Sequence, residues 1–237
     1  MATVVSLLPL NASVISVNLT EFATDAQQID SDETFGIASE GSVVGGWVNL
    51  NQTLTASNVT DSNGLATTVD ISGTAPNGWA SFNAAYDDTP LKGGIDDYTG
   101  TVNATTLTLG QLNATFANGY KVIVYLGGFN SNEGASISDG TTTYYYQAAD
   151  SPSAPVTFVA TTDTSDDGSG TAPEAQYAVF GSDSSPLTGD SITFTLDTLY
   201  GGGSAITGVQ IVGIPEPGIP LLILSGVLPV FVRRRSS

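Results

Sequence analysis

The sequence predicts an all-β protein, an antiparallel sandwich of two sheets followed by a short hydrophobic helix at the C-terminus. Helical periodicity of any length is missing before that helix, and short apolar-alternating runs rich in Val, Ile, Thr, Tyr and Phe recur instead. Clusters of Gly, Asn, Asp, Ser and Pro separate these runs, as turns separate strands. About ten strands in roughly 200 residues fit a two-sheet sandwich that folds as one domain, which we expect over residues 13–213.

Individual strands follow from the spacing of their apolar residues. Polar and apolar positions alternate strictly over residues 191–196, as in a strand with one buried face. Residues 122–126 are apolar at every position, which predicts a strand covered on both sides. In chain order, the clearest predicted strands are residues 14–22, 66–72, 101–109, 120–127, 142–148, 156–161, 176–181, 191–197 and 205–214.

The first residues, 1–12, are partly apolar but contain no Lys or Arg. An export signal normally has a basic start, an apolar centre and a small-residue cleavage site. Asn11-Ala12-Ser13 is a weak candidate for the cleavage site. We expect residues 1–12 to be a truncated signal or unstructured start, and the alternative is the edge of a first strand.

Composition excludes several classes of function. The chain has 23 acidic and 5 basic residues, and only Lys92 and Lys121 are basic before the C-terminal tail, so a nucleic-acid partner is not expected. His and Cys are both absent, which excludes Ser-His-Asp and Cys-His catalysis as usually built and the commonest zinc sites. The chain has only six glutamates, and none of them lies in a recognisable catalytic context for glycoside hydrolysis. We expect no enzymatic activity, with a hydrolase built on an acid pair as the remote alternative.

The C-terminal tail combines three features in a fixed order. Pro215-Glu216-Pro217 precedes an apolar run over residues 219–232, which ends in Arg233, Arg234 and Arg235. The run is shorter than the roughly 20 residues that usually cross a bilayer, so a buried core strand or an amphipathic element is the alternative. The run shows neither a period of 2 nor one of 3.6, which favours a short membrane anchor.

This order of parts resembles the PEP-CTERM protein-sorting signal of bacterial exported proteins, here over residues 214–237. The resemblance implies that an exosortase, a membrane-embedded protease, cuts near Pro215-Glu216-Pro217. The helix over 219–232 would anchor the chain transiently in the inner membrane, and the Arg cluster 233–235 would stay in the cytoplasm. The mature protein would then reach the cell surface or be secreted.

Four short strings in the domain are similar to a group of bacterial surface proteins that also end in sorting tails. The strings are residues 15–18, 46–50, 120–128 and 206–212. This resemblance implies a galactose-binding-like jelly roll. The group has no established activity, so the resemblance implies none for this chain.

One acidic loop has the residue types of a calcium site. Asp163, Asp166 and Asp167 are followed by Gly168 and Gly170, and calcium loops need oxygen ligands at short spacing with glycines for sharp turns. The loop lacks the final glutamate of an EF-hand. Calcium is therefore the one cofactor that the sequence suggests, and the alternative is a solvated linker between strands.

Aromatic residues are candidates for sugar stacking, as in carbohydrate-binding modules. We single out Trp47, Trp79 and Tyr145 as ligand-binding candidates. In a strand, Tyr144 and Tyr146 share one face and Tyr145 takes the other, so at least one of these faces is expected to be core. The alternative for the three candidates is core packing.

The expected function is that of an exported surface or extracellular-matrix protein with a structural or adhesive role. The alternative is a carbohydrate-binding module that uses exposed aromatic residues, with or without calcium. Expected partners are the exosortase, the inner membrane and extracellular polysaccharide.

Overall fold

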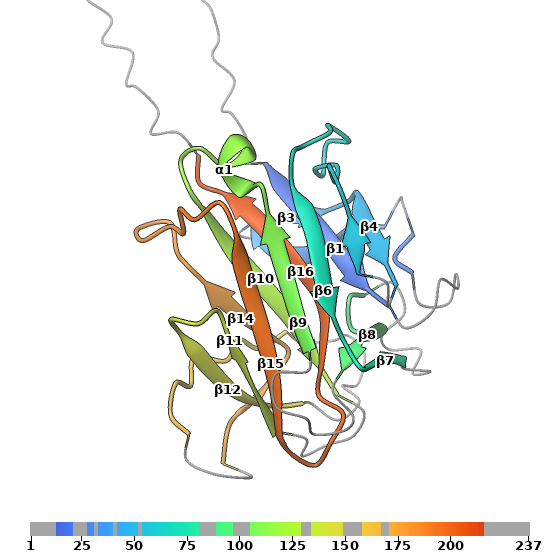
Figure 1. Cartoon of the computed structure of the whole chain (residues 1–237), viewed down its shortest axis with the longest axis vertical. Coiled ribbons are helices and arrows are strands. Elements are labelled where there is room, and N and C mark those ends of the chain that lie inside the picture. The colour runs from blue at the N-terminus through green and yellow to red at the C-terminus, as the bar shows by residue number, and fades with distance from the viewer. Residues whose placement is uncertain are drawn as a thin grey trace, which may run out of the picture.

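The computed structural model describes residues 13–20, 28–30, 33–39, 42–51, 54–80, 89–96, 105–128, 134–148, 158–166 and 171–215. They form mainly β-strands in two mixed sheets that face each other, with one short helix, α1 (Leu112–Thr115), at one end (Figure 1). The all-β prediction is confirmed, and the arrangement is that of a β-sandwich.

The first sheet has the order β14 (Tyr177–Phe180), β10 (Tyr120–Gly127), β16 (Ala205–Gly213), β1 (Val14–Leu19) and β4 (Trp47–Leu50). Strand β8 (Gly93–Asp96) pairs with the start of β16, and β7 (Asn77–Ala80) pairs with β8. A separate hairpin consists of β2 (Phe35–Ser39) and β3 (Ser42–Val44).

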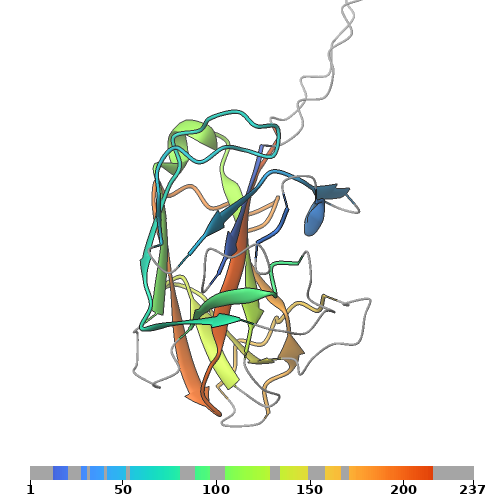
Figure 2. The same cartoon turned by 90° about the vertical axis from the view of Figure 1, so that its right-hand side faces the viewer.

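The second sheet has the order β13 (Glu174–Ala175), β12 (Thr143–Ala148), β11 (Gly134–Ser138), β15 (Ile192–Tyr200), β9 (Thr105–Gly110), β6 (Asp70–Thr74) and β5 (Thr55–Ala56). Figure 2 shows this sheet on one side, the first sheet in the middle and the hairpin β2–β3 on the other side.

The prediction of purely antiparallel sheets is wrong at two pairings. Strands β1 and β4 pair in parallel, and so do β12 and β13. A parallel pair needs a long connection that returns the chain to the same end of the sheet. Both pairs have one, because residues 20–46 separate β1 from β4 and residues 149–173 separate β12 from β13.

The two strongest strand patterns are confirmed in detail. Strand β10 has the predicted bounds, and residues 122–126 are buried at every position. Strand β15 buries Phe194 and Leu196 and turns Thr193 and Thr195 outward. The predicted strand over 156–161 is wrong within its described part, where Ala160 makes only an isolated bridge to Tyr177.

The main core lies between the sheets. Alternate residues of β1, β10 and β16 meet alternate residues of β9, β11 and β15, as the two-residue period of a strand requires. All of these side chains are almost completely buried: Ile15, Val17, Val122, Val124, Val209, Ile211, Leu107, Leu109, Ile137, Phe194 and Leu196.

A second, aromatic core covers the other face of the first sheet. Trp47 and Tyr125 project from this face and pack against Phe35 of the hairpin β2–β3 and against Phe158. The first sheet is therefore covered on both sides, which explains the continuous apolar run in β10.

The described ends of the chain lie side by side at the α1 end of the sandwich (Figure 1). The Gly213 N–H donates to the carbonyl of Ser13 at 2.9 Å, and Pro215 is exposed. Residues 1–12 and the sorting-signal residues Glu216, Pro217, Arg233, Arg234 and Arg235 lie outside the described residues, and so does the predicted C-terminal helix. Within the described ranges, no helix has the length and apolar character needed to span a membrane.

Candidate functional site

A groove of about 420 Å³ lies on the outer face of the second sheet, over β11, β12 and β15. Its lining contains hydroxyl groups, one aromatic ring, one apolar side chain and two carboxylates: Ser136, Ser138, Gly140, Thr143, Tyr145, Asp166, Thr195, Asp197 and Leu199.

Strand alternation places these side chains on one face. Strand β11 sends Ala135 and Ile137 into the core, so Ser136 and Ser138 point outward. Register then aligns the neighbours, because Ser136 pairs with Tyr145 of β12 on one side and with Asp197 of β15 on the other. The three strands therefore present tyrosine, serine and aspartate in one row.

The row beside it contains only hydroxyl residues. Ser138 pairs with Thr143 of β12 and with Thr195 of β15. A tight turn closes this end, where the Asp139 carboxylate accepts hydrogen bonds from the N–H groups of Thr141 and Thr142 at 2.9 and 2.7 Å. Gly140 has φ +85° in this turn, a conformation that favours glycine.

One wall of the groove comes from the loop over residues 161–166. This loop runs along β12, where the Tyr145 N–H donates to the carbonyl of Asp163 at 2.9 Å and the Thr161 hydroxyl donates to the carbonyl of Tyr145 at 2.6 Å. These two bonds bring Asp166 to the groove. Tyr145 and Asp166, predicted for separate reasons, therefore line the same site.

Of the other two predicted calcium ligands, the structure describes only Asp163. The Asp163 carboxylate accepts a hydrogen bond from the N–H of Ser165 in its own loop at 2.9 Å, and Asp167 lies outside the described residues. Among the residues that the structure describes, no group of three Asp or Glu side chains could hold a metal ion. Calcium binding stays a prediction.

The ligand-binding interpretation of Trp47 is corrected by its burial. Only 6% of Trp47 is exposed, and its Nε1–H donates to the carbonyl of Phe35 at 3.2 Å. Its ring packs against Phe35 and Tyr125, so it has no free face for a sugar. Trp79 lies in β7, and its side chain is outside the described part of the chain.

Sequence reasoning missed Ser136, Thr195, Asp197 and Leu199 as site residues. The usable signal was the outward half of two alternating strands, Ser-x-Ser in β11 and Thr-x-Asp-x-Leu in β15. Leu199 is 46% exposed and supplies apolar surface beside the carboxylate of the same strand. Outward residues of this kind become a site only when the neighbouring strands are known.

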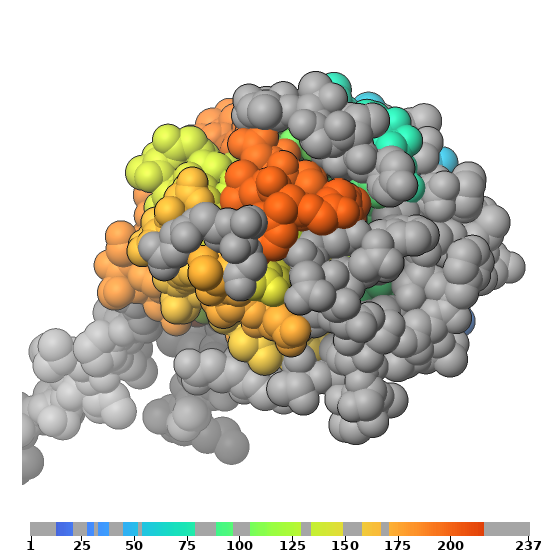
Figure 3. Space-filling view, turned by 90° about the horizontal axis from the view of Figure 1, so that it is seen from below, coloured from blue at the N-terminus to red at the C-terminus, as the bar shows by residue number. Residues whose placement is uncertain are grey.

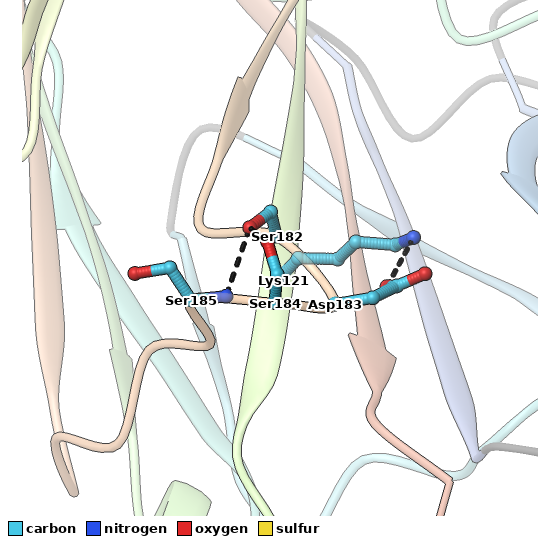
Figure 4. A network of polar contacts seen from close by, with 5 residues as sticks. All are labelled: Lys121, Ser182, Asp183, Ser184 and Ser185. Atoms are coloured by element: carbon cyan, nitrogen blue, oxygen red, sulfur yellow. Dashed lines mark hydrogen bonds and ion pairs between the residues drawn. The ribbon is translucent and has the colours of Figure 1, made fainter.

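The two lysines before the tail lie away from the groove. Lys121 pairs with the exposed carboxylate of Asp183 at 2.9 Å, on the turn that Figure 4 shows with Ser182, Ser184 and Ser185. Lys92 is buried, and burial lowers the pKa of its ammonium group. The groove therefore has hydrogen-bonding and negative groups without a basic residue in its lining.

The groove lies toward the end of the sandwich where β15 turns into β16, opposite the end where β16 stops. Figure 3 views the molecule from this end, where β11, β12 and the segment after residue 158 lie beside the β15–β16 turn. The groove and Pro215 therefore lie toward opposite ends of the domain. Comparisons with protein-family models, with curated proteins and with solved structures find no match for this chain.

Proposed function

We propose that the chain is an exported bacterial surface or matrix protein with an adhesive role, and that its domain binds extracellular polysaccharide in the groove over β11, β12 and β15. The observation that carries the proposal is the row Tyr145–Ser136–Asp197, which lines the groove. A tyrosine has an apolar ring with a polar tip, which suits a sugar ring edged with hydroxyls. The groove volume is within the range of small-ligand sites.

We also infer that the sandwich is a galactose-binding-like jelly roll. The four strings that resemble bacterial surface proteins fall on β1, β4, β10 and β16. These strands are neighbours in the first sheet, in the order β10, β16, β1 and β4. The resemblance therefore covers one continuous part of the fold, which supports a common architecture.

The sorting function rests on the tail and is supported by where the chain leaves the domain. Gly213 is the last residue of β16 and is buried, whereas Pro215 is exposed. A protease acting near Pro215-Glu216-Pro217 would meet the exposed Pro215, and a residue that precedes a proline favours an extended backbone. Because the groove is at the opposite end, a domain held by its tail would present the groove away from the membrane.

The sorting proposal is tested by intact mass and cell fraction of the protein produced in a bacterium that has an exosortase. We expect the wild-type chain to lose its tail and to appear at the surface or in the medium. A variant that lacks residues 215–237 should keep its translated mass and should not pass through the membrane-anchored stage. A full-length wild-type protein left in the cytoplasm would contradict the proposal.

The binding proposal is tested with soluble neutral polysaccharides by affinity electrophoresis and calorimetry. Tyr145→Ala should weaken binding by about tenfold or more, since aromatic anchors commonly contribute above roughly 1 kcal/mol. Leu65→Ala is the matched control, because Leu65 is 65% exposed on the loop beside the start of β1, away from the groove. Equal affinities of the wild type and the Tyr145→Ala variant would refute the groove as the site.

Repeating the titration with a chelator distinguishes calcium-dependent from calcium-independent polysaccharide binding. The placement of Asp166 in the groove motivates this arm. Loss of binding with the chelator and recovery with added calcium would make the metal part of the site, and unchanged binding would exclude it.

A further inference from the structure

The outer face of the second sheet continues beyond the groove as a regular array of hydroxyl groups. Three neighbouring strands carry two outward hydroxyl residues each: Ser72 and Thr74 on β6, Thr106 and Thr108 on β9, Thr193 and Thr195 on β15. Their alternate neighbours, such as Leu107 and Phe194, fill the core. The array is therefore a property of the whole sheet face.

Strand register aligns these residues in two straight rows across the sheet. One row is Thr74, Thr106, Thr195, Ser138 and Thr143, and the other is Thr55, Ser72, Thr108 and Thr193. Neighbouring strands are about 4.8 Å apart, and alternate residues of one strand are roughly 6.8 Å apart. The hydroxyls thus form a two-dimensional grid, which we call the hydroxyl face.

The hydroxyl face is exposed and its side chains are ordered. Every residue in the two rows is exposed or half-buried. The hydroxyls of Thr108 and Thr193 are 2.8 Å apart, and those of Thr74 and Thr106 are 3.0 Å apart, so neighbouring strands exchange hydrogen bonds through their side chains. β-Branched residues also have few rotamers, so binding to this face costs little side-chain entropy.

The hydroxyl face contains no charged residue in a chain with 23 acidic residues. Exposed sheet faces usually mix charged residues among the polar ones to stay soluble and monomeric. Among the described residues, acids flank the two rows without entering them: Asp70 and Asp197 occupy the adjacent outward positions of β6 and β15, and Asp166 lies in the loop that walls the groove. The two rows are thus an uncharged stretch on a strongly acidic molecule, with acids only at their border.

We propose that the hydroxyl face docks the flat surface of an ordered, neutral polysaccharide, with the groove at its edge holding one chain of that surface. This inference rests on the proposed polysaccharide binding and names the class of ligand. A neutral glycan ribbon offers hydroxyl donors and acceptors that match those of threonine and serine. Glycans with carboxylate or sulfate groups would be repelled by a protein of net charge −18.

The experiment is sedimentation of the purified domain with microcrystalline cellulose, a neutral and ordered polysaccharide. The double substitution Thr108→Val and Thr193→Val keeps the β-branched shape and removes two hydroxyls, and it should lower the bound fraction by at least about fivefold. Thr193→Glu, which places a charge inside the array, should lower it further. Thr60→Val with Thr171→Val, and Thr60→Glu, are matched controls, because both threonines are exposed and outside the two rows.

The outcomes separate the hydroxyl face from the groove. Loss of cellulose binding in the array variants, with soluble-glycan binding and the melting temperature unchanged, supports the proposal. Array variants that sediment like the wild type, while Tyr145→Ala loses binding, overturn the docking face and leave the groove standing. Stronger sedimentation of the valine variant also overturns it, because the contact would then be apolar. Failure of the wild type to bind any polysaccharide overturns both proposals.

Discussion

Gln210 is the residue that connects the first sheet to the layer that covers it. Its side-chain carbonyl accepts hydrogen bonds from the Tyr125 hydroxyl at 2.6 Å and from the N–H of Ile37 at 3.3 Å, and its amide donates to the Ser16 hydroxyl at 2.9 Å. Gln210, Tyr125 and Ser16 are fully buried. A satisfied polar group in this position specifies where the hairpin β2–β3 docks, since a displaced hairpin leaves buried groups unpaired.

Replacing this amide by an apolar side chain should therefore be costly. Gln210→Leu leaves the Tyr125 hydroxyl without its acceptor, and we expect a loss of about 2–3 kcal/mol in the free energy of unfolding. Urea denaturation measures the loss. Adding Tyr125→Phe should recover part of it, because the orphaned hydroxyl is removed. A midpoint unchanged by Gln210→Leu would show that the amide contributes nothing to docking.

Buried tyrosines should make the domain sensitive to high pH. Burial, with a smaller contribution from the Asp190 carboxylate, raises the pKa of Tyr120 from 10.0 to about 12. Burial also raises the pKa of Tyr125. At a pH between 10 and about 12, Tyr120 ionises in the unfolded chain but keeps its proton in the folded protein. The free energy of unfolding therefore falls as the pH rises from about 10 to about 12.

Urea midpoints measured from pH 8 to pH 12 test this dependence. Tyr120→Phe should flatten part of the alkaline fall and should cost about 1 kcal/mol at neutral pH, because the hydroxyl donates to the carbonyl of Gly189 at 2.9 Å. An alkaline fall as steep in the variant as in the wild type would exclude Tyr120 as its source.

At the scale of elements, the hairpin β2–β3 shows where local sequence and tertiary structure meet. Gly36 has φ +126°, and a Cβ at this position would overlap the Gln210 amide. The glycine is thus required both by its backbone conformation and by the close approach of β2 to β16. Phe35 and Ile37, on either side of Gly36, both pack on the aromatic core, so the strand is stabilised by the layer beneath it.

Gly36→Ala should detach the hairpin, with a loss of about 1–3 kcal/mol in unfolding free energy and greater protease sensitivity near residues 33–44. Gly45→Ala is the matched control, because a Cβ there meets only ordinary contacts and its φ is not in the left-handed region. Equal effects of the two substitutions would refute the close-approach argument. Fluorescence of the buried Trp47 gives an independent signal of exposure of the aromatic core.

The predictability of each strand follows from the source of its stability. Strand β15 buries large apolar residues at alternate positions and β10 buries a continuous run of them, so the existence of both was predicted correctly. Strands β7 and β8 are short and glycine-containing, and their pairing depends on contacts distant in the sequence. The groove could be predicted only in part. Tyr145 is a recognisable candidate because it is aromatic. Ser136 and Asp197 become candidates only when strand register places them in line with Tyr145.

At the scale of the whole molecule, β16 is a central strand that ends where the tail begins. It pairs antiparallel with β10 on one side and with β1 on the other. The hydrogen bonds of such pairs run perpendicular to the strands. A force applied at the C-terminal end of β16 and directed along the strand would shear both ladders at once, rather than opening them bond by bond. Under the proposed adhesive role, these two pairings of β16 would let the domain resist tension between its C-terminal end and the groove.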